Sequence, residues 1–156
     1  MPPIYGVNFI CPKSQTMNVE SKTLSHFCSY RVIYGDTDAM GIAYHANYLR
    51  WFEMGRNELF RHLGLPYREI EAEGFMLPVS EVKCKYLTPA RYDDVLVIET
   101  TVNAGFRAGI QFDYVIANKD CTVTHTTGYT RHAFVNTQGR VVRPPVFIRD
   151  LIKEKR

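Results

Sequence analysis

One stretch of the chain, residues 48–63, has the periodicity of a long amphipathic helix, and no other stretch has it over a comparable length. Its apolar stripe recurs at steps of three and four residues and consists of Tyr48, Phe52, Gly55, Leu59 and Leu63. Gly64 and Pro66 follow and predict the end of the helix. A helix of about 16 residues is roughly 24 Å long. It could therefore lie across a whole sheet of about five strands.

Segments rich in β-branched and aromatic residues surround this helix. One precedes it, and four follow a short helix expected at 66–74; they span residues 27–34, 77–87, 94–102, 109–117 and 121–135. Turn residues punctuate the later segments at short intervals, which favours antiparallel hairpins over parallel crossovers. A short closing helix is expected from Pro145 through Ile152. The sequence predicts an α+β domain with an antiparallel sheet of about five strands around one long helix.

The chain of 156 residues is the right size for one domain. Residues 1–25 lack sustained periodicity, so we expect a flexible N-terminal extension followed by one domain over residues 26–156. Met17 is a second candidate for the natural start of the protein.

Charge and cysteine usage exclude several classes of function. The net charge is only +3 and no basic run is long enough to follow a nucleic-acid backbone, so nucleic acid is not an expected partner. No apolar run approaches the length that spans a bilayer, so membrane insertion is not expected either. The four cysteines are far apart and show no CxxC spacing. We expect them to be reduced, which indicates a cytoplasmic protein.

The residues best suited to chemistry lie between the first strand and the long helix. Asp36 and Asp38 stand two positions apart in an irregular segment, where an acid often serves only to bind nearby amides. We expect this structural role for Asp36. Asp38 lies closer to Gly41, where the absence of a Cβ lets the backbone approach a ligand. Asp38 is therefore the better candidate for a reacting carboxylate.

His45 lies at the expected start of the helix, where unpaired amides and the helix dipole favour negative charge. A thioester carbonyl held there would be polarised. The alternative is that His45 only precedes the helix and that Asn47 is the N-cap residue. Two acids and a histidine could also bind a divalent metal, but their spacing is not that of a helical ligand pair, so we expect no metal.

The same segment resembles the signature of the hotdog-fold thioesterases. The resemblance is carried by Tyr34-Gly35-Asp36-Thr37-Asp38, Gly41, His45-Ala46-Asn47-Tyr48-Leu49-Arg50-Trp51-Phe52-Glu53 and Gly55-Arg56. It extends over about residues 28–152, with Pro89-Ala90-Arg91-Tyr92-Asp93-Asp94 as a further match. More narrowly, the chain resembles the 4-hydroxybenzoyl-CoA thioesterase group and its relatives, the acyl-CoA thioesterases associated with the Tol-Pal system. Members with aromatic substrates carry a tyrosine where His45 stands, so this chain is more similar to the Tol-Pal branch.

This resemblance implies a hotdog fold, a curved antiparallel sheet wrapped around one long helix. It implies homodimers or homotetramers with acyl-CoA bound between protomers, and hydrolysis of acyl-CoA to a carboxylic acid and CoA without a cofactor. The implied catalytic residues are Asp38, as nucleophile or general base, with His45 and Tyr34. The implied substrate-binding residues are Gly41, Ala46, Arg91, Arg107 and Arg131.

Two other functions fit the same fold. Hotdog proteins also include hydratases and dehydratases, although these use a different arrangement of acid and histidine. A non-catalytic protein that binds acyl-CoA or an acyl carrier protein as a sensor is the alternative outside enzymology. Release of thiol distinguishes hydrolysis from both.

Overall fold

The structure is a computed structural model that describes residues 24–103 and 109–155. Its elements in chain order are β1 (Ser25–Arg31), the 3₁₀ turn η2 (Tyr34–Asp36), α1 (Asn47–His62), α2 (Tyr67–Ala72), β2 (Phe75–Met76), β3 (Val79–Tyr86), β4 (Val95–Asn103), β5 (Gly109–Asn118), β6 (Thr124–Asn136), β7 (Val141–Val142) and α3 (Val146–Glu154). The extension expected at residues 1–25 lies almost wholly outside the described residues, so the domain boundary stays a prediction.

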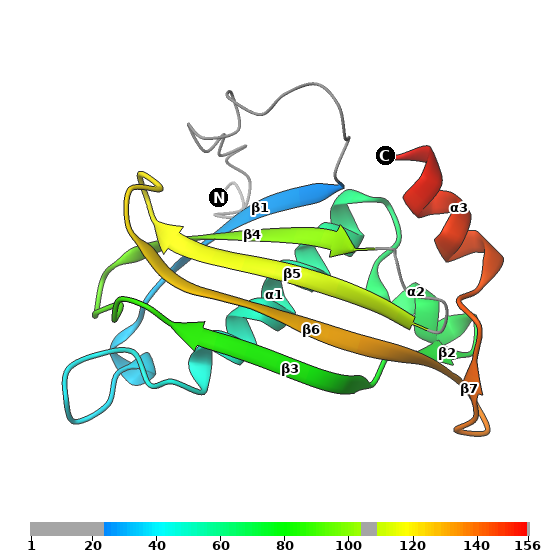
Figure 1. The fold of residues 1–156 in the computed structure, drawn as a ribbon, viewed down its shortest axis with the longest axis horizontal. Coiled ribbons are helices and arrows are strands. Elements are labelled where there is room, and N and C mark those ends of the chain that lie inside the picture. The colour runs from blue at the N-terminus through cyan, green and yellow to red at the C-terminus, as the bar shows by residue number, and fades with distance from the viewer. Residues whose placement is uncertain (1–23, 104–108, 156) are drawn as a thin grey trace, which may run out of the picture.

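All strand pairs are antiparallel, and the strands β1, β4, β5 and β6 lie side by side in that order. Strand β6 also pairs with β3 and with the two short strands β2 and β7. Figure 1 shows α1 behind the sheet, crossing its strands. The α+β prediction of five main strands and one long helix is confirmed, and the two-residue strands β2 and β7 are additions to it.

Helix α1 lies very close to the sheet because two glycines make room for it. A Cβ on Gly55 would stand 2.4 Å from Thr100 Oγ1. On the sheet side, a Cβ on Gly128 would stand 2.9 Å from the ring of Phe52. The Phe52 ring instead stacks on Tyr114, with 4.3 Å between ring centroids and 7° between planes. The predicted apolar stripe of α1 is the centre of the core.

The first strand ends earlier than the sequence predicts. Residues 27–34 were the expected strand, but β1 stops at Arg31 and the chain turns at η2. The turn forms because the Asp36 carboxylate accepts a hydrogen bond from the Ile33 amide at 3.0 Å. Sequence periodicity cannot reveal this bond, because Ile33 and Tyr34 are both good strand formers.

A buried polar network lies between α1 and the strands β5 and β6. His132 Nδ1 lies 2.9 Å from the Leu77 carbonyl oxygen, and its Nε2 lies 2.8 Å from Thr130 Oγ1 and 3.3 Å from Arg56 Nη1. Thr130 also bonds to the Tyr114 hydroxyl at 2.9 Å. Burial is the main cause that lowers the pKa of His132 to about 4. A neutral ring satisfies all its neighbours, since Nδ1 donates to Leu77 and Nε2 accepts from Arg56.

Gly55→Ala should lower the free energy of unfolding by about 1–3 kcal/mol, because the new methyl group overpacks the contact with Thr100 and Ile98. Alanine has a higher helix propensity than glycine, which by itself would stabilise α1. A lower free energy of unfolding in the variant would therefore show that the steric clash with the sheet outweighs the gain in helix propensity. Urea denaturation measures it. Gly35→Ala is the matched control, since nothing lies within 4 Å of its added Cβ. Equal stability of the Gly55 variant and the wild type would contradict the close-packing argument.

Acidification should destabilise the fold through His132. The unfolded residue takes up a proton below about pH 6.5, whereas the folded one does so only near pH 4, so the free energy of unfolding falls as the pH decreases through this window. The contribution is at most about 3 kcal/mol. His132→Gln should remove this part of the slope in urea titrations at pH 7.5, 6 and 5. An unchanged slope in the variant would refute it.

Candidate active site

The segment between β1 and α1 forms a narrow hairpin. Tyr44 N donates to Asp36 O at 2.8 Å, and Asp38 N donates to Ile42 O at 2.9 Å. Between these bonds, Thr37 and Ala43 form an isolated antiparallel bridge. The tip is closed by a bond from Gly41 N to Asp38 O at 2.9 Å, with Gly41 at φ +71°. A glycine in the left-handed region is what a three-residue hairpin loop requires, so Gly41 shapes the loop.

Asp36 attaches this hairpin to the rest of the domain. Asp36 is only 1% exposed. Its carboxylate accepts hydrogen bonds from the Tyr30 hydroxyl at 2.8 Å and the Ile33 amide at 3.0 Å, and Arg50 Nη1 lies 3.6 Å away. Its main-chain oxygen accepts from Asn47 Nδ2 at 2.8 Å. A carboxylate with this many partners is a structural group, as expected, and it joins β1, the hairpin and α1.

Asp38 lies at the tip of the hairpin, half-buried. Its Oδ1 accepts a hydrogen bond from the Met40 amide at 2.8 Å, which is an Asx turn. Asp38 thus binds the amide two residues after it, whereas Asp36 binds the Ile33 amide three residues before it. Its Oδ2 has no hydrogen-bond partner among residues 24–103 and 109–155. Asp38 is therefore held in place through one oxygen and can act through the other.

The start of α1 is not capped by a side chain. Its N-cap residue is Ala46, so the alternative that placed the cap at Asn47 is wrong. Asn47 is the first helical residue, and its amide group is committed to Asp36 O. No group in the described part of the chain accepts a hydrogen bond from the Ala46 amide. The first turn of α1 therefore presents an unpaired N–H, the kind of group that stabilises a developing oxyanion.

Aromatic side chains surround this helix start. The exposed His45 ring lies 4.5 Å from the Tyr44 ring and 6.3 Å from the Tyr86 ring. Tyr34 is 78% exposed and packs edge-on against Tyr92 at 5.7 Å. Met40 and Leu87 add to the exposed apolar surface of the same region. Apolar surface gathered around a polar loop is typical of a ligand or protein contact.

The structure separates the three basic residues that were expected to bind substrate. Arg91 is exposed beside the hairpin, with Nη1 3.5 Å from Gly41 O. Arg131 belongs to β6 and bonds to Glu81 at 2.6 Å and Gln111 at 2.8 Å. Its neighbours Thr130 and His132 belong to the buried network under α1, so Arg131 faces the opposite side of the sheet. Arg107 lies outside the described residues.

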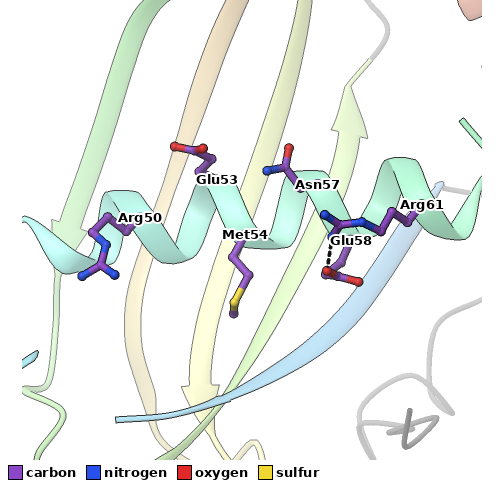
Figure 2. A pocket seen from close by; sticks show the side chains of 6 residues that line it. All are labelled: Arg50, Glu53, Met54, Asn57, Glu58 and Arg61. Atoms are coloured by element: carbon purple, nitrogen blue, oxygen red, sulfur yellow. Dashed lines mark hydrogen bonds and ion pairs between the residues drawn. The ribbon is translucent and has the colours of Figure 1, made fainter. Parts of the chain in front are cut away.

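A hollow of about 440 Å³ runs along the outer side of α1. Figure 2 shows its side chains, with a basic residue at each end of the row and two acids, an amide and a methionine between them. They are Arg50, Glu53, Met54, Asn57, Glu58 and Arg61. Glu58 and Arg61 form an ion pair within it. No residue expected at the active site lines this hollow.

The described residues also bear on metal binding, membrane insertion and the state of the cysteines. Residues 24–103 and 109–155 hold no group of three or more His, Cys, Asp or Glu that could bind a metal ion. No helix among them is long and apolar enough to cross a bilayer. Cys28 and Cys84 are free, but Cys121 is in a disulfide, so the expectation that every cysteine is reduced is wrong at Cys121.

Sequence reasoning missed three residues of this region: Tyr30, Asn47 as a side-chain donor, and Tyr86. The Tyr86 hydroxyl donates to the His45 carbonyl oxygen at 2.9 Å, although the two residues are 41 positions apart. No local pattern marks such a contact. The alternation of 77–87 indicated only that Tyr86 shares a face with Cys84 and Val82.

Comparisons with known proteins show to which family this chain belongs. A family model described as "Thioesterase-like superfamily" matches residues 32–152. A protein of Aquifex aeolicus, named an esterase only provisionally, is 32% identical over 80% of this chain and 94% of its own length. The acyl-CoA thioester hydrolase YbgC of Escherichia coli is 36% identical over 60% of this chain and 69% of its own.

Solved structures agree with the family assignment. The crystal structure of a DHNA-CoA thioesterase from Staphylococcus aureus has a TM-score of 0.75 and 26% identity, covering 84% of this chain and 87% of that one. Both the sequence match over residues 32–152 and the shared sheet-and-helix architecture lead to one conclusion. The chain belongs to the thioesterase-like superfamily, and its fold is the hotdog fold.

Proposed function

We propose that this protein hydrolyses acyl-CoA thioesters to a carboxylic acid and CoA. The observation that carries the proposal is a single tight hairpin that holds an uncommitted carboxylate oxygen on Asp38 and leads into the uncapped start of α1. The superfamily membership and the hydrolase name of the Escherichia coli relative support it. A carboxylate and an oxyanion donor are the two groups that acyl transfer to water needs.

Asp38 can act in either of two ways. As general base, it takes a proton from water while the water oxygen attacks the thioester carbon; the C–S bond then breaks, and the CoA thiolate recovers the proton. As nucleophile, its Oδ2 attacks the carbon and expels CoA thiolate, and water then hydrolyses the mixed anhydride. Both routes consume one water and release one acid and one thiol. Both develop negative charge on the carbonyl oxygen.

The start of α1 is the proposed site for that charge. The Ala46 N–H is unpaired and lies at the positive end of the helix dipole. The exposed His45 ring would add a hydrogen bond to the carbonyl oxygen, and Gly41 would let the acyl group approach the backbone. Tyr34, at the entry of the hairpin, stays the third predicted catalytic residue. Removal of one oxyanion donor typically lowers kcat by about a hundredfold or more.

Basic residues are the proposed contacts for the CoA phosphates. Arg91 is the best supported, because it is exposed and lies against the hairpin at Gly41. Arg107 and Arg131 stay predictions. For Arg131 the contact would have to come from the face of the sheet opposite α1.

We also propose a homodimer that joins two β3 strands edge to edge, with dimers able to pair into tetramers. Among the described strands, β3 pairs only with β6, so its other edge is open. Val79 and Val82 on this strand are 53% and 46% exposed. An exposed edge strand with apolar side chains is a template for pairing with another strand. The apolar surface around the hairpin would then lie beside the partner.

The cytoplasm is the proposed location, since acyl-CoA is made and used inside the cell. The free thiols of Cys28 and Cys84 agree with a reducing compartment, whereas the disulfide of Cys121 does not support it.

Asp38→Asn should reduce thiol release from acyl-CoA by at least about a thousandfold, because the amide can neither attack the thioester nor accept a proton from water. A thiol-reactive dye assays the release across acyl chain lengths, on both CoA and acyl carrier protein. The amide oxygen can still accept from Met40 N, so the melting temperature should not change.

Asp120→Asn is the control for this variant, because Asp120 is exposed in the turn between β5 and β6. It should keep wild-type turnover. Normal turnover by the Asp38 variant would exclude Asp38 as the reacting group. Stoichiometric binding of acyl-CoA by the wild type without thiol release would instead indicate a sensor.

Val82→Lys should weaken the dimer at least about tenfold, because a two-fold axis through the strand pair brings the two added charges near each other. Light scattering after size exclusion measures the mass. Val146→Lys on α3 is the matched control, since Val146 is 59% exposed and lies on another element. A monomeric wild type, or a Val82 variant with an unchanged mass at all dilutions, would rule out this interface.

A further inference from the structure

Tyr86 lies where the edge strand β3 passes the start of α1. Its hydroxyl donates to the His45 carbonyl oxygen at 2.9 Å. Its ring also packs edge-on against Tyr48 at 5.3 Å and against His45 at 6.3 Å. Tyr48 is itself buried and fixed, because its hydroxyl accepts from the Ala90 amide at 3.1 Å. Tyr86 is thus held by a rigid neighbour while it holds the His45 carbonyl.

The bonded oxygen belongs to the peptide group that contains the Ala46 N–H. A trans peptide is planar, and its C=O and N–H point in opposite directions. No cis peptide is present in the described backbone. A bond that fixes the oxygen of residue 45 therefore fixes the direction of the amide of residue 46. That amide is one of the unpaired N–H groups at the start of α1.

Among residues 24–103 and 109–155, no other side chain forms a hydrogen bond to this peptide group. The N-cap residue is Ala46, which cannot form a side-chain cap. The Asn47 side chain, which could have bonded to a nearby backbone group, is committed to Asp36 O and Arg50. The side chain that orients the peptide between residues 45 and 46 is therefore Tyr86, which belongs to β3 and not to α1.

The Tyr86 hydroxyl keeps its proton across the working range of an enzyme. Burial first, and then the nearby Cys84 thiol and Tyr48, raise the pKa of Tyr86 to about 12. A protonated phenol can only donate to a carbonyl oxygen, which has no proton to give. The hydroxyl therefore stays protonated, and able to donate to the His45 carbonyl oxygen, well above neutral pH.

We propose that Tyr86 is a positioning residue: by holding the His45 carbonyl, it aims the Ala46 N–H at the oxyanion formed from the thioester. The inference rests on the proposed hydrolysis. It adds a residue that does not touch the substrate but sets the geometry of the group that stabilises the transition state. Because a preorganised donor is worth more than a mobile one, loss of the hydroxyl should affect kcat and leave substrate binding largely intact.

Tyr86→Phe tests this, because it removes the hydroxyl and keeps both ring contacts. The variant should lose about ten- to a hundredfold in kcat with KM changed less than about twofold. Tyr67→Phe is the matched control: its hydroxyl also bonds to one backbone group, accepting from Leu77 N at 3.0 Å, but it lies on α2. That control should keep the wild-type kcat.

A pair of inhibitors separates positioning from a general loss of structure. A trifluoromethyl ketone analogue of acyl-CoA adds water or the Asp38 carboxylate at its carbonyl carbon, so its oxygen mimics the oxyanion of the tetrahedral intermediate, whereas the methyl ketone analogue stays a plain carbonyl. Tyr86→Phe should bind the first at least about tenfold more weakly and the second unchanged. Equal loss on both analogues, or a change confined to KM, would overturn the positioning role.

The outcomes also separate this inference from the proposed function. Wild-type hydrolysis together with an unchanged kcat in Tyr86→Phe overturns only the role of Tyr86. Absence of wild-type hydrolysis overturns both. If the Phe variant does not fold, 3,5-difluorotyrosine at position 86 keeps the ring and the hydroxyl but lowers the phenol pKa. Its kcat should then fall as the pH rises through that pKa, and a flat profile would refute the role.

Discussion

The close contact between α1 and the sheet is the constraint on which the other features depend. Phe52 stacks on Tyr114, and Gly55 and Gly128 leave no Cβ between the two layers. This contact fixes the axis of the helix over the strands and therefore the place where its first turn begins. The candidate site lies at that first turn. A helix that rested on larger side chains would be displaced by ångströms, and an oxyanion donor tolerates much less than that.

Asp36 links the hairpin to the packed core and so fixes the position of the hairpin relative to α1. Its buried carboxylate holds Tyr30 of β1 and the turn at Ile33, and its main-chain oxygen holds Asn47 of α1. The neighbouring acid, Asp38, is anchored through only one oxygen. Two acids of the same short segment thus have different roles because one is buried among donors and the other lies at a half-exposed hairpin tip. Because Asp36 makes the structural hydrogen bonds of this segment, Asp38 is available for chemistry.

Much of this could be predicted from the sequence. The apolar stripe from Tyr48 to Leu63 predicted α1, and alternation with turn residues predicted the antiparallel strands. The family signature in residues 34–56 indicated the hotdog fold and thioester hydrolysis. The prediction was less accurate where a side chain of one element decides the backbone of another: β1 ends early because Asp36 bonds to Ile33, and the helix N-cap is Ala46 because Asn47 serves Asp36. The disulfide of Cys121 was also missed, since spacing along the chain does not show spatial pairing.

The sequence by itself determined the elements, their order and the residue types available for catalysis. Periodicity and turn chemistry are local, so they can be recognised in a window of several residues. Only the tertiary structure decided which acid is buried, which edge of the sheet stays open, and that Tyr86 bonds to His45 across 41 positions. These outcomes depend on contacts between distant segments. No pattern within a short window of the sequence encodes such contacts.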